Sequence, residues 1–133
     1  MRGTIAYLDT SAFVKLLIEE RESSALRREL SKWPDYASST LLVTETLRSV
    51  RRSGNDLHVE LALKLLDSVN LIKIDEMLVK QAGYINPPEV RSLDSIHLAS
   101  ALNLQLELGV FLVYDQRLKS AAEALSLPVA SPV

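Results

Sequence analysis

The chain has 133 residues, of which 47% are hydrophobic and 24% charged, a length and composition that fit one compact globular domain. Its 15 basic and 17 acidic residues give a formal net charge of −2, which neither indicates nor excludes a nucleic-acid partner. It has no cysteine, which excludes disulfides, thiolate zinc sites and cysteine nucleophiles. No apolar run approaches the roughly 20 residues that span a bilayer, and no signal region follows Arg2, so we expect a cytoplasmic protein without a membrane partner.

Short apolar runs alternate with helical patterns along the first half of the chain. Apolar runs bounded by polar residues predict strands, and a spacing of three to four between apolar residues predicts helices. In chain order we expect a strand at Thr4–Leu8, helices over Ser11–Leu17 and Ser23–Lys32, a strand at Tyr36–Ser38, helices over Leu41–Arg52 and Leu57–Val69, and a strand at Leu71–Ile74.

The second half of the chain continues the same alternation. A helix over Glu76–Gly83 ends before Asn86-Pro87-Pro88, and a longer helix runs from Leu93 to about Glu107, with Ser92 as its cap and Gly109 closing it. The most apolar strand is Val110–Tyr114; a helix at Leu118–Leu125 and a weak strand at Pro128–Ala130 complete the chain. Alternating strands and helices predict an α/β fold with a mostly parallel sheet of four to five short strands.

Two acidic residues directly follow predicted buried strands. Asp9 comes after the first strand and Asp115 after the most apolar one. Because parallel strands end at the same edge of a sheet, and ligands bind at that edge where the strand order reverses, these carboxylates can be neighbours. The alternative use of each residue is as a helix cap, which is common after a strand.

Two further acids lie within predicted helices. Asp94 occupies the first turn of its helix, where the helix dipole favours a carboxylate. Glu45 shares a helical face with Leu41 and Leu42 in a stretch without other charges. A carboxylate on an apolar face is costly unless a partner such as a metal ion compensates it. Four converging carboxylates suit a hard ion, Mg²⁺ or Mn²⁺, and such a site suits phosphodiester hydrolysis.

These motifs resemble a known family. Tyr7-Leu8-Asp9-Thr10-Ser11-Ala12, Glu45 within a helix, Leu93-Asp94-Ser95-Ile96-His97-Leu98-Ala99 and Tyr114-Asp115-Gln116-Arg117-Leu118 follow the order and spacing of PIN domains, and more narrowly of VapC-type toxin ribonucleases. The resemblance implies one PIN-like nuclease domain over residues 1–133 with a three-layer α/β/α fold. It also implies an Mg²⁺- or Mn²⁺-dependent endoribonuclease acting on RNA, a cognate VapB-like antitoxin and a homodimer.

The resemblance also assigns roles to individual residues. Asp9 and Asp94 would be the most direct metal ligands, and Glu45 and Asp115 would complete the shell directly or through water. Ser11 matches the hydroxyl that supports the first acid. The chain departs from the family at Val113, where many relatives carry a hydroxyl residue, and at Arg117, where some carry another acid.

Several residues allow two interpretations. His97 follows Asp94 on one helix face, and we favour a core histidine bonded to backbone or a carboxylate over a metal ligand. Arg48 and Arg52 after Glu45, and Arg117 after Asp115, are candidate contacts for RNA phosphates or a solvated surface. His58 fits a surface position. Leucines in the first two helices could form a dimer face or pack on the sheet: Leu16, Leu17, Leu26 and Leu30.

Two other classes of function remain open at this point. A non-catalytic RNA-binding or protein-interaction module on the same fold draws support from the missing hydroxyl at Val113. A receiver-like phosphoacceptor domain also carries acids at strand ends, but it requires adjacent acids after the first strand, where this chain has Asp9 followed by Thr10 and Ser11.

Overall fold

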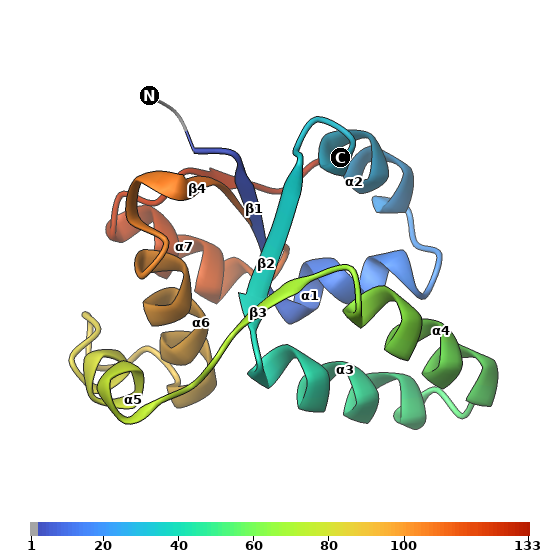
Figure 1. Cartoon of the computed structure of the whole chain (residues 1–133), viewed down its shortest axis with the longest axis horizontal. Coiled ribbons are helices and arrows are strands. Elements are labelled where there is room, and N and C mark those ends of the chain that lie inside the picture. The colour runs from blue at the N-terminus through green and yellow to red at the C-terminus, as the bar shows by residue number, and fades with distance from the viewer. Residues whose placement is uncertain (1–2) are drawn as a thin grey trace.

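A computed structural model describes residues 3–133 (Figure 1). One sheet contains five strands: β1 (Ile5–Leu8), β2 (Asp35–Ser39), β3 (Asn70–Ile72), β4 (Leu108–Leu112) and β5 (Val129–Ala130). Their order across the sheet is β3-β2-β1-β4-β5, and every neighbouring pair is parallel. The predicted sheet is confirmed, with five strands that are all parallel.

Helices cover both faces of the sheet. They are α1 (Thr10–Phe13), the 3-10 turn η1 (Val14–Leu16), α2 (Ser23–Leu30), α3 (Leu41–Arg52), α4 (Asp56–Leu66), α5 (Glu76–Gly83), α6 (Ser92–Leu102), the 3-10 turn η2 (Gln105–Glu107) and α7 (Gln116–Ala124). In Figure 1, α5, α6 and α7 lie on one side of the strands, and α3 and α4 lie side by side on the other. This is the three-layer α/β/α fold that the sequence predicts.

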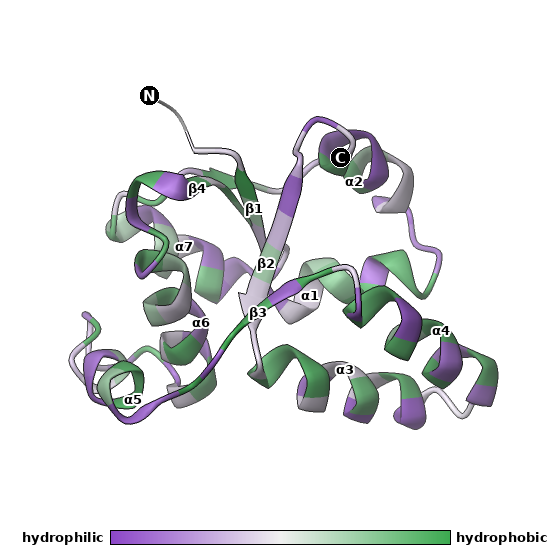
Figure 2. Cartoon of the chain, viewed as in Figure 1, coloured by the Kyte–Doolittle hydropathy of each residue, from purple (hydrophilic) through white to green (hydrophobic). Residues whose placement is uncertain are grey.

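Strand residues alternate between two hydrophobic clusters because successive side chains of a strand point to opposite faces. Ala6 and Leu8 of β1 pack in the cluster that includes residues of α1 to α4. Tyr7 faces the other way and packs with Phe111 and Leu98 in the cluster formed by α6 and α7. Figure 2 shows the resulting hydrophobic character of β1 and β4. Burial on both faces explains why these strands are continuously apolar.

β2 is central in the sheet although its sequence is polar, and it is paler than β1 in Figure 2. Its two buried serines are satisfied by hydrogen bonds: the Ser38 hydroxyl donates to the Leu8 carbonyl at 2.7 Å, and the Ser39 hydroxyl accepts from the Leu41 backbone N–H at 3.0 Å. A buried polar group with a partner costs little. The second of these bonds also fixes the entry of the chain into α3.

The strand order reverses between β1 and β4. From β1 the chain proceeds to β2 and β3 on one side, whereas β4 and β5 lie on the other. The register pairs Leu8 with Leu112, so both strands end at the same height. The crevice outside such a switch point is the usual place for a ligand in an open parallel sheet.

The helix predicted from Leu93 to Glu107 is too long. α6 begins at Ser92, with Arg91 rather than Ser92 at the cap position, and ends at Leu102. Gln105 then adopts a left-handed φ of 52°, a conformation that commonly terminates helices, and a 3-10 turn leads into β4. Gly109 does not close the helix; it lies inside β4.

The strand predicted at Val110–Tyr114 is displaced towards the C-terminus. β4 spans Leu108–Leu112 because its pairing partner β1 starts at Ile5 and ends at Leu8. The predicted helix at Ser11–Leu17 is also interrupted, since α1 gives way to a 3-10 turn at Val14. The helix predicted to Val69 ends at Leu66. By contrast, the bounds predicted for α3 and α5 match the structure.

The leucines of the first two helices pack inside the chain. Leu17, Leu26 and Leu30 are buried in the cluster beneath α1 to α4, and Leu16 packs against it. Leu17, Leu26 and Leu30 thus pack in the core, whereas Leu16 keeps part of its surface exposed. His58 is only partly exposed, against the expected surface position. Met1 and Arg2, which the predicted single domain includes, lie outside the described residues.

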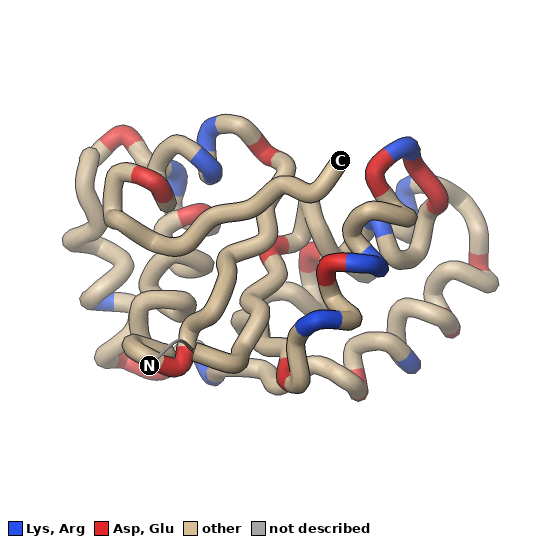
Figure 3. The backbone as a smooth tube through the Cα atoms, turned by 90° about the horizontal axis from the view of Figure 1, so that it is seen from above, with Lys and Arg blue, Asp and Glu red and all other residues tan. Residues whose placement is uncertain are grey.

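Acidic and basic residues are interleaved along the backbone in Figure 3. Any recognition of a polyanion must then depend on local basic groups rather than on the net field of −2. Within residues 3–133, no helix is both long and apolar enough to cross a membrane.

Candidate active site

The four acids predicted from the sequence come from four elements that meet beyond the C-terminal edge of the sheet. Asp9 follows β1 directly, and Asp115 precedes α7. Asp94 lies in the first turn of α6 and Glu45 in the second turn of α3. Besides burial, the negative charges of Asp115 and Glu45 raise the pKa of Asp94, so each of these two acids lies near enough to Asp94 to repel its charge.

Asp9 and Asp115, the two acids that follow strands, also cap helices, which is the alternative use expected for them from the sequence. The Asp9 carboxylate accepts a hydrogen bond from the Ala12 N–H at 2.9 Å, and that of Asp115 accepts one from the Leu118 N–H at 2.9 Å. Capping occupies one carboxylate oxygen of each residue through a backbone donor. The capping bond thus fixes the orientation of each side chain. Capping and metal binding by the same carboxylate are compatible, because the cap uses only one of its two oxygens.

Ser11 links the two strand ends at the centre of the site. Its hydroxyl lies 2.7 and 2.8 Å from the two Asp9 carboxylate oxygens, to which it donates. The same oxygen accepts hydrogen bonds from the backbone N–H groups of Tyr114 and Asp115 at 2.9 and 3.2 Å. Ser11 therefore orients Asp9 and holds the segment after β4 against it. This geometry supports the role of Ser11 as the residue that assists the first acid.

Glu45 is held by a network that the sequence did not predict in full. One of its oxygens, Oε1, accepts a hydrogen bond from the Thr10 hydroxyl and lies 2.8 Å from His97 Nε2. The other ring nitrogen of His97 is 2.7 Å from the Tyr7 hydroxyl. The preference for a core histidine bonded to a carboxylate is confirmed, because His97 is 2% exposed. Thr10 and Tyr7 belong to the recognised motif, but their partners lie far away in the sequence.

Burial and mutual repulsion perturb the acids. Burial raises the pKa of Asp9 to about 6, against the lowering effects of His97 and the Ser11 hydroxyl. Burial, followed by the charge of Asp115, also raises the pKa of Asp94. Burial acts to raise the pKa of Glu45 as well, but the hydrogen bonds from His97 and Thr10 outweigh it and leave the pKa below its ordinary value.

The donor set fits a hard divalent cation. Asp9 is 3% exposed, and burial without a cationic partner is unfavourable for its charged form. Among residues 3–133, no three acidic or imidazole side chains are grouped closely enough to hold a metal ion together. Mg²⁺ commonly takes only one or two protein carboxylates and keeps several waters. A site with two direct carboxylate ligands is therefore compatible with this arrangement.

A groove of about 590 Å³ opens beside Glu45 between α1 and α3. Thr10, Ser11 and Glu45 line it together with Arg48 and Arg52, so two of the predicted phosphate-binding residues lie next to the acids. Arg51, on the same helix, is exposed but does not line the groove. The groove combines the carboxylate of Glu45 with two cationic side chains, and guanidinium groups are suited to binding phosphate.

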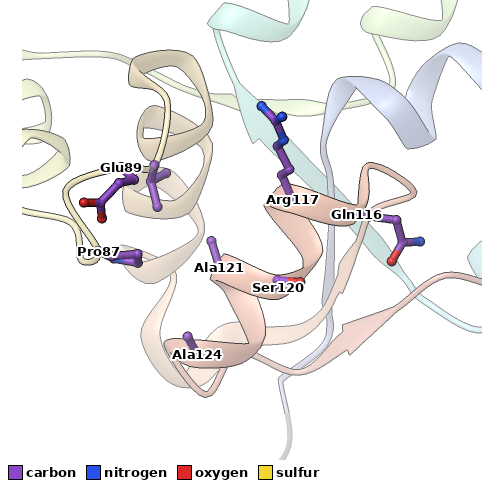
Figure 4. Close-up of a pocket in the computed structure, with 8 residues that line it drawn as sticks. Pro87, Glu89, Gln116, Arg117, Ser120, Ala121 and Ala124 are labelled. Atoms are coloured by element: carbon purple, nitrogen blue, oxygen red, sulfur yellow. The ribbon is translucent and has the colours of Figure 1, made fainter.

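Arg117 lies in a different place from the other two arginines. It borders a second pocket, of about 630 Å³, between α7 and the segment before α6. Figure 4 shows this pocket between Pro87 and the small residues Ala121 and Ala124, with Arg117 extending away from them. Arg117 thus stands on the α7 side of the site, next to Asp115, and it does not share the groove of Arg48 and Arg52.

The comparison with known families decides the class of this chain. Residues 6–124 match the model of the PIN domain. The chain belongs to the PIN-domain family. This PIN domain is 41% identical over 130 residues to ribonuclease VapC47 of Mycobacterium tuberculosis, a match that covers 95% of this chain and 96% of the relative.

A second relative and a solved structure are also similar to this chain. Ribonuclease VapC46 of Mycobacterium tuberculosis is 38% identical over 126 residues, with 95% of this chain and 96% of the relative covered. A solved structure described as a toxin–antitoxin complex from Klebsiella pneumoniae contains a chain of the same fold, with a TM-score of 0.71 at 19% identity, covering 96% of this PIN domain and 98% of that chain. The VapC assignment made from the motifs is confirmed, and the full-length homologues are ribonucleases.

Proposed function

We propose that this PIN domain is a cytoplasmic, divalent-metal-dependent endoribonuclease that hydrolyses phosphodiester bonds in RNA. The observation that carries the proposal is the position of Asp9, Glu45, Asp94 and Asp115 around one sheet edge in a chain that matches ribonucleases over its full length. Burial, together with the negative charges of Asp115 and Glu45, raises the pKa of Asp94, and a cation would favour the charged form of this carboxylate.

In this proposal each acid has a defined task. Asp9 and Asp94 bind the cation directly, and Glu45 and Asp115 complete the shell directly or through water. Bound Mg²⁺ or Mn²⁺ would neutralise charge on the phosphate and lower the pKa of water. Glu45, held through one oxygen by Thr10 and His97, uses its other oxygen to orient the water that attacks phosphorus. Ser11 keeps Asp9 in place for this work.

Arginines on two sides of the acids hold the RNA backbone. Arg48 and Arg52 line the groove beside Glu45, and Arg117 follows Asp115 at the start of α7. Guanidinium groups form charge-assisted, often bidentate bonds to phosphate. We expect them to position the strand on either side of the scissile bond without reading its sequence.

The non-catalytic alternative loses its support in the structure. That alternative relied on Val113, which lacks the hydroxyl of many relatives. The Val113 side chain is fully buried and packs in the cluster with Leu98 and Leu118, while Ser11 supplies the hydroxyl beside Asp9. The side chain at position 113 thus serves the core, and its replacement does not weaken the acid cluster.

We further propose that the chain is the toxin of a toxin–antitoxin pair and forms a homodimer. A chain of the same fold occurs in a toxin–antitoxin complex, which supports the antitoxin partner. A VapB-like antitoxin that inhibits this enzyme is expected to cover the groove beside Glu45. Sedimentation equilibrium of the purified chain should give twice its mass of 14.8 kDa, and a monomer at micromolar concentration would contradict the homodimer.

The test of the nuclease proposal is cleavage of purified total RNA by the chain freed from any partner. Cleavage should require Mg²⁺ or Mn²⁺, stop with EDTA, and disappear in Asp9→Asn, Asp94→Asn and Glu45→Gln variants that keep the native circular dichroism spectrum. Asp75→Asn is the matched control, because Asp75 caps α5 through the Leu78 N–H as Asp9 caps α1, but lies away from the acids. Cleavage that survives in Asp9→Asn, or none with any metal, overturns the proposal.

A further inference from the structure

A chain of hydrogen bonds leads from the hydrophobic core to Glu45. The Tyr7 hydroxyl lies 2.7 Å from His97 Nδ1, and His97 Nε2 lies 2.8 Å from Glu45 Oε1. Tyr7 and His97 are 0% and 2% exposed. The three residues come from β1, α6 and α3, so the chain joins elements that are separate in the sequence.

The direction of each bond follows from what the groups can donate. Burial raises the pKa of the Tyr7 phenol, which therefore keeps its proton. The carboxylate of Glu45 only accepts, so in the neutral imidazole of His97 the proton is on Nε2, and Nδ1 accepts from the Tyr7 hydroxyl. The nearby Ser38 and Ser100 hydroxyls donate to the backbone carbonyls of Leu8 and Ile96. The short distance of 2.7 Å between the Tyr7 hydroxyl and His97 Nδ1 assigns the phenol proton to this bond.

The same glutamate oxygen receives a second donor. The Thr10 hydroxyl at the start of α1 also donates to Oε1, so both available directions of this oxygen are used. Among residues 3–133, the other oxygen, Oε2, accepts no hydrogen bond from the protein. Glu45 lines the groove with Arg48 and Arg52, so the unbonded oxygen belongs to the only acid of that lining.

We propose that His97 is a positioning residue that, with Thr10, holds Oε1 of Glu45 and thereby presents Oε2 alone to the reacting groups. Tyr7 fixes the ring of His97 from behind and selects its tautomer. This inference rests on the proposed nuclease function and adds a task for Thr10 and for two buried residues, Tyr7 and His97. Only Oε2 of Glu45 then acts on the reacting groups, because Oε1 is held by the hydrogen bonds from Thr10 and His97.

A pair of substitutions at position 97 separates positioning from packing. His97→Gln places an amide near the position of Nε2 and can still donate to Glu45, whereas the shorter His97→Asn cannot reach it. Val50→Ala serves as the control, because Val50 is buried on the same helix as Glu45 but lies outside the hydrogen-bond chain. It loses stability through a cavity and should keep its activity per folded molecule.

We expect His97→Asn to lower kcat for RNA cleavage about 10- to 100-fold, the usual effect of removing a group that orients a metal-site residue. KM should change less than twofold, and His97→Gln should recover most of the loss. Thr10→Val should lower kcat in the same way. Unchanged kcat in His97→Asn, or equal losses in the Asn, Gln and Val50→Ala variants at matched stability, overturns the inference.

A second measurement does not depend on cleavage. The ¹⁵N NMR shifts of His97 should show the tautomer protonated at Nε2, and His97→Asn should weaken Mn²⁺ binding in calorimetry while His97→Gln preserves it. A proton on Nδ1 instead contradicts the assigned bond directions and with them the inference. If wild-type protein cleaves no RNA, the proposed nuclease function fails, whereas the tautomer and the Mn²⁺ affinities still judge the role of His97.

Discussion

At the scale of single residues, Asp9 is a site where stability and function oppose each other. Its pKa of about 6 lies well above the ordinary value of 3.8 because the side chain is buried. A shift of this size corresponds to about 3 kcal/mol against the charged form at neutral pH. At neutral pH the ionised carboxylate of Asp9 therefore destabilises the metal-free fold, and a bound cation would offset this cost.

Replacing Asp9 with asparagine should therefore stabilise the metal-free protein while abolishing cleavage. Asparagine keeps an acceptor for the Ala12 N–H and removes the buried charge. We expect Asp9→Asn to raise Tm by several degrees at pH 7.5, whereas the exposed cap variant Asp75→Asn gains nothing. Thermal unfolding with EDTA measures the difference. A lower Tm for Asp9→Asn would show that burial does not penalise this charge.

The pH dependence of this effect has a definite sign. Because the folded-state pKa of Asp9 exceeds that of the unfolded chain, the folded protein binds more protons between about pH 4 and pH 6. The wild type consequently loses stability relative to Asp9→Asn as pH rises through this window, and the two should coincide near pH 4. Mn²⁺ affinity of the wild type should fall as pH decreases through about 6, since the cation must displace the proton. A pH-independent difference in Tm would refute this account.

At the scale of elements, the join between β1 and β4 depends on Ser11. Removing its hydroxyl leaves the N–H groups of Tyr114 and Asp115 without their acceptor and frees Asp9 to rotate. We expect Ser11→Ala to cost about 1–3 kcal/mol of unfolding free energy and to lower kcat. Urea denaturation and cleavage assays measure both effects. Ser120→Ala, at an exposed position of α7, is the control, and equal behaviour of the two variants would deny Ser11 this role.

Gly109 allows β4 to pack closely against two other segments. A Cβ atom at this position would lie 2.1 Å from the Trp33 ring and 2.7 Å from the Gly3 carbonyl oxygen, so the close approach of three segments requires glycine. Gly109→Ala should destabilise the chain by about 1–3 kcal/mol through overpacking. Gly83→Ala, with open space around its Cβ, is the matched control for denaturation. Equal unfolding midpoints for both variants would contradict the packing argument.

Sequence patterns predicted the features that depend on neighbouring residues and failed where a feature depends on residues far apart in the chain. Hydrophobic periodicity located α3 and α5 correctly because their patterns and caps are local. It placed β4 two residues late because the register with β1, rather than the apolar run, sets the strand ends. The contacts of Ser11 with Tyr114, and of Tyr7 with His97, join positions 103 and 90 residues apart. No local pattern specifies such pairs.

At the scale of the whole molecule, RNA binding has to be local because the net charge of −2 offers no general attraction. Each guanidinium that contacts a phosphate of a single strand should contribute about 0.7 to the slope of log affinity against log salt. Arg48 and Arg52 line the groove beside Glu45, and their neighbour Arg51 does not. The three arginines of one helix thus provide an internal comparison in which only position differs.

Fluorescence anisotropy with a short single-stranded RNA, on a cleavage-inactive Asp94→Asn background, should reveal that difference. Arg48→Ala and Arg52→Ala should each weaken binding and reduce the salt slope by somewhat less than one unit, while Arg51→Ala leaves both unchanged. Equal effects of all three substitutions would indicate diffuse attraction to the surface of α3 and remove the groove from the RNA path. A selective effect of Arg48 and Arg52 places the backbone within reach of the one glutamate oxygen that the protein leaves free.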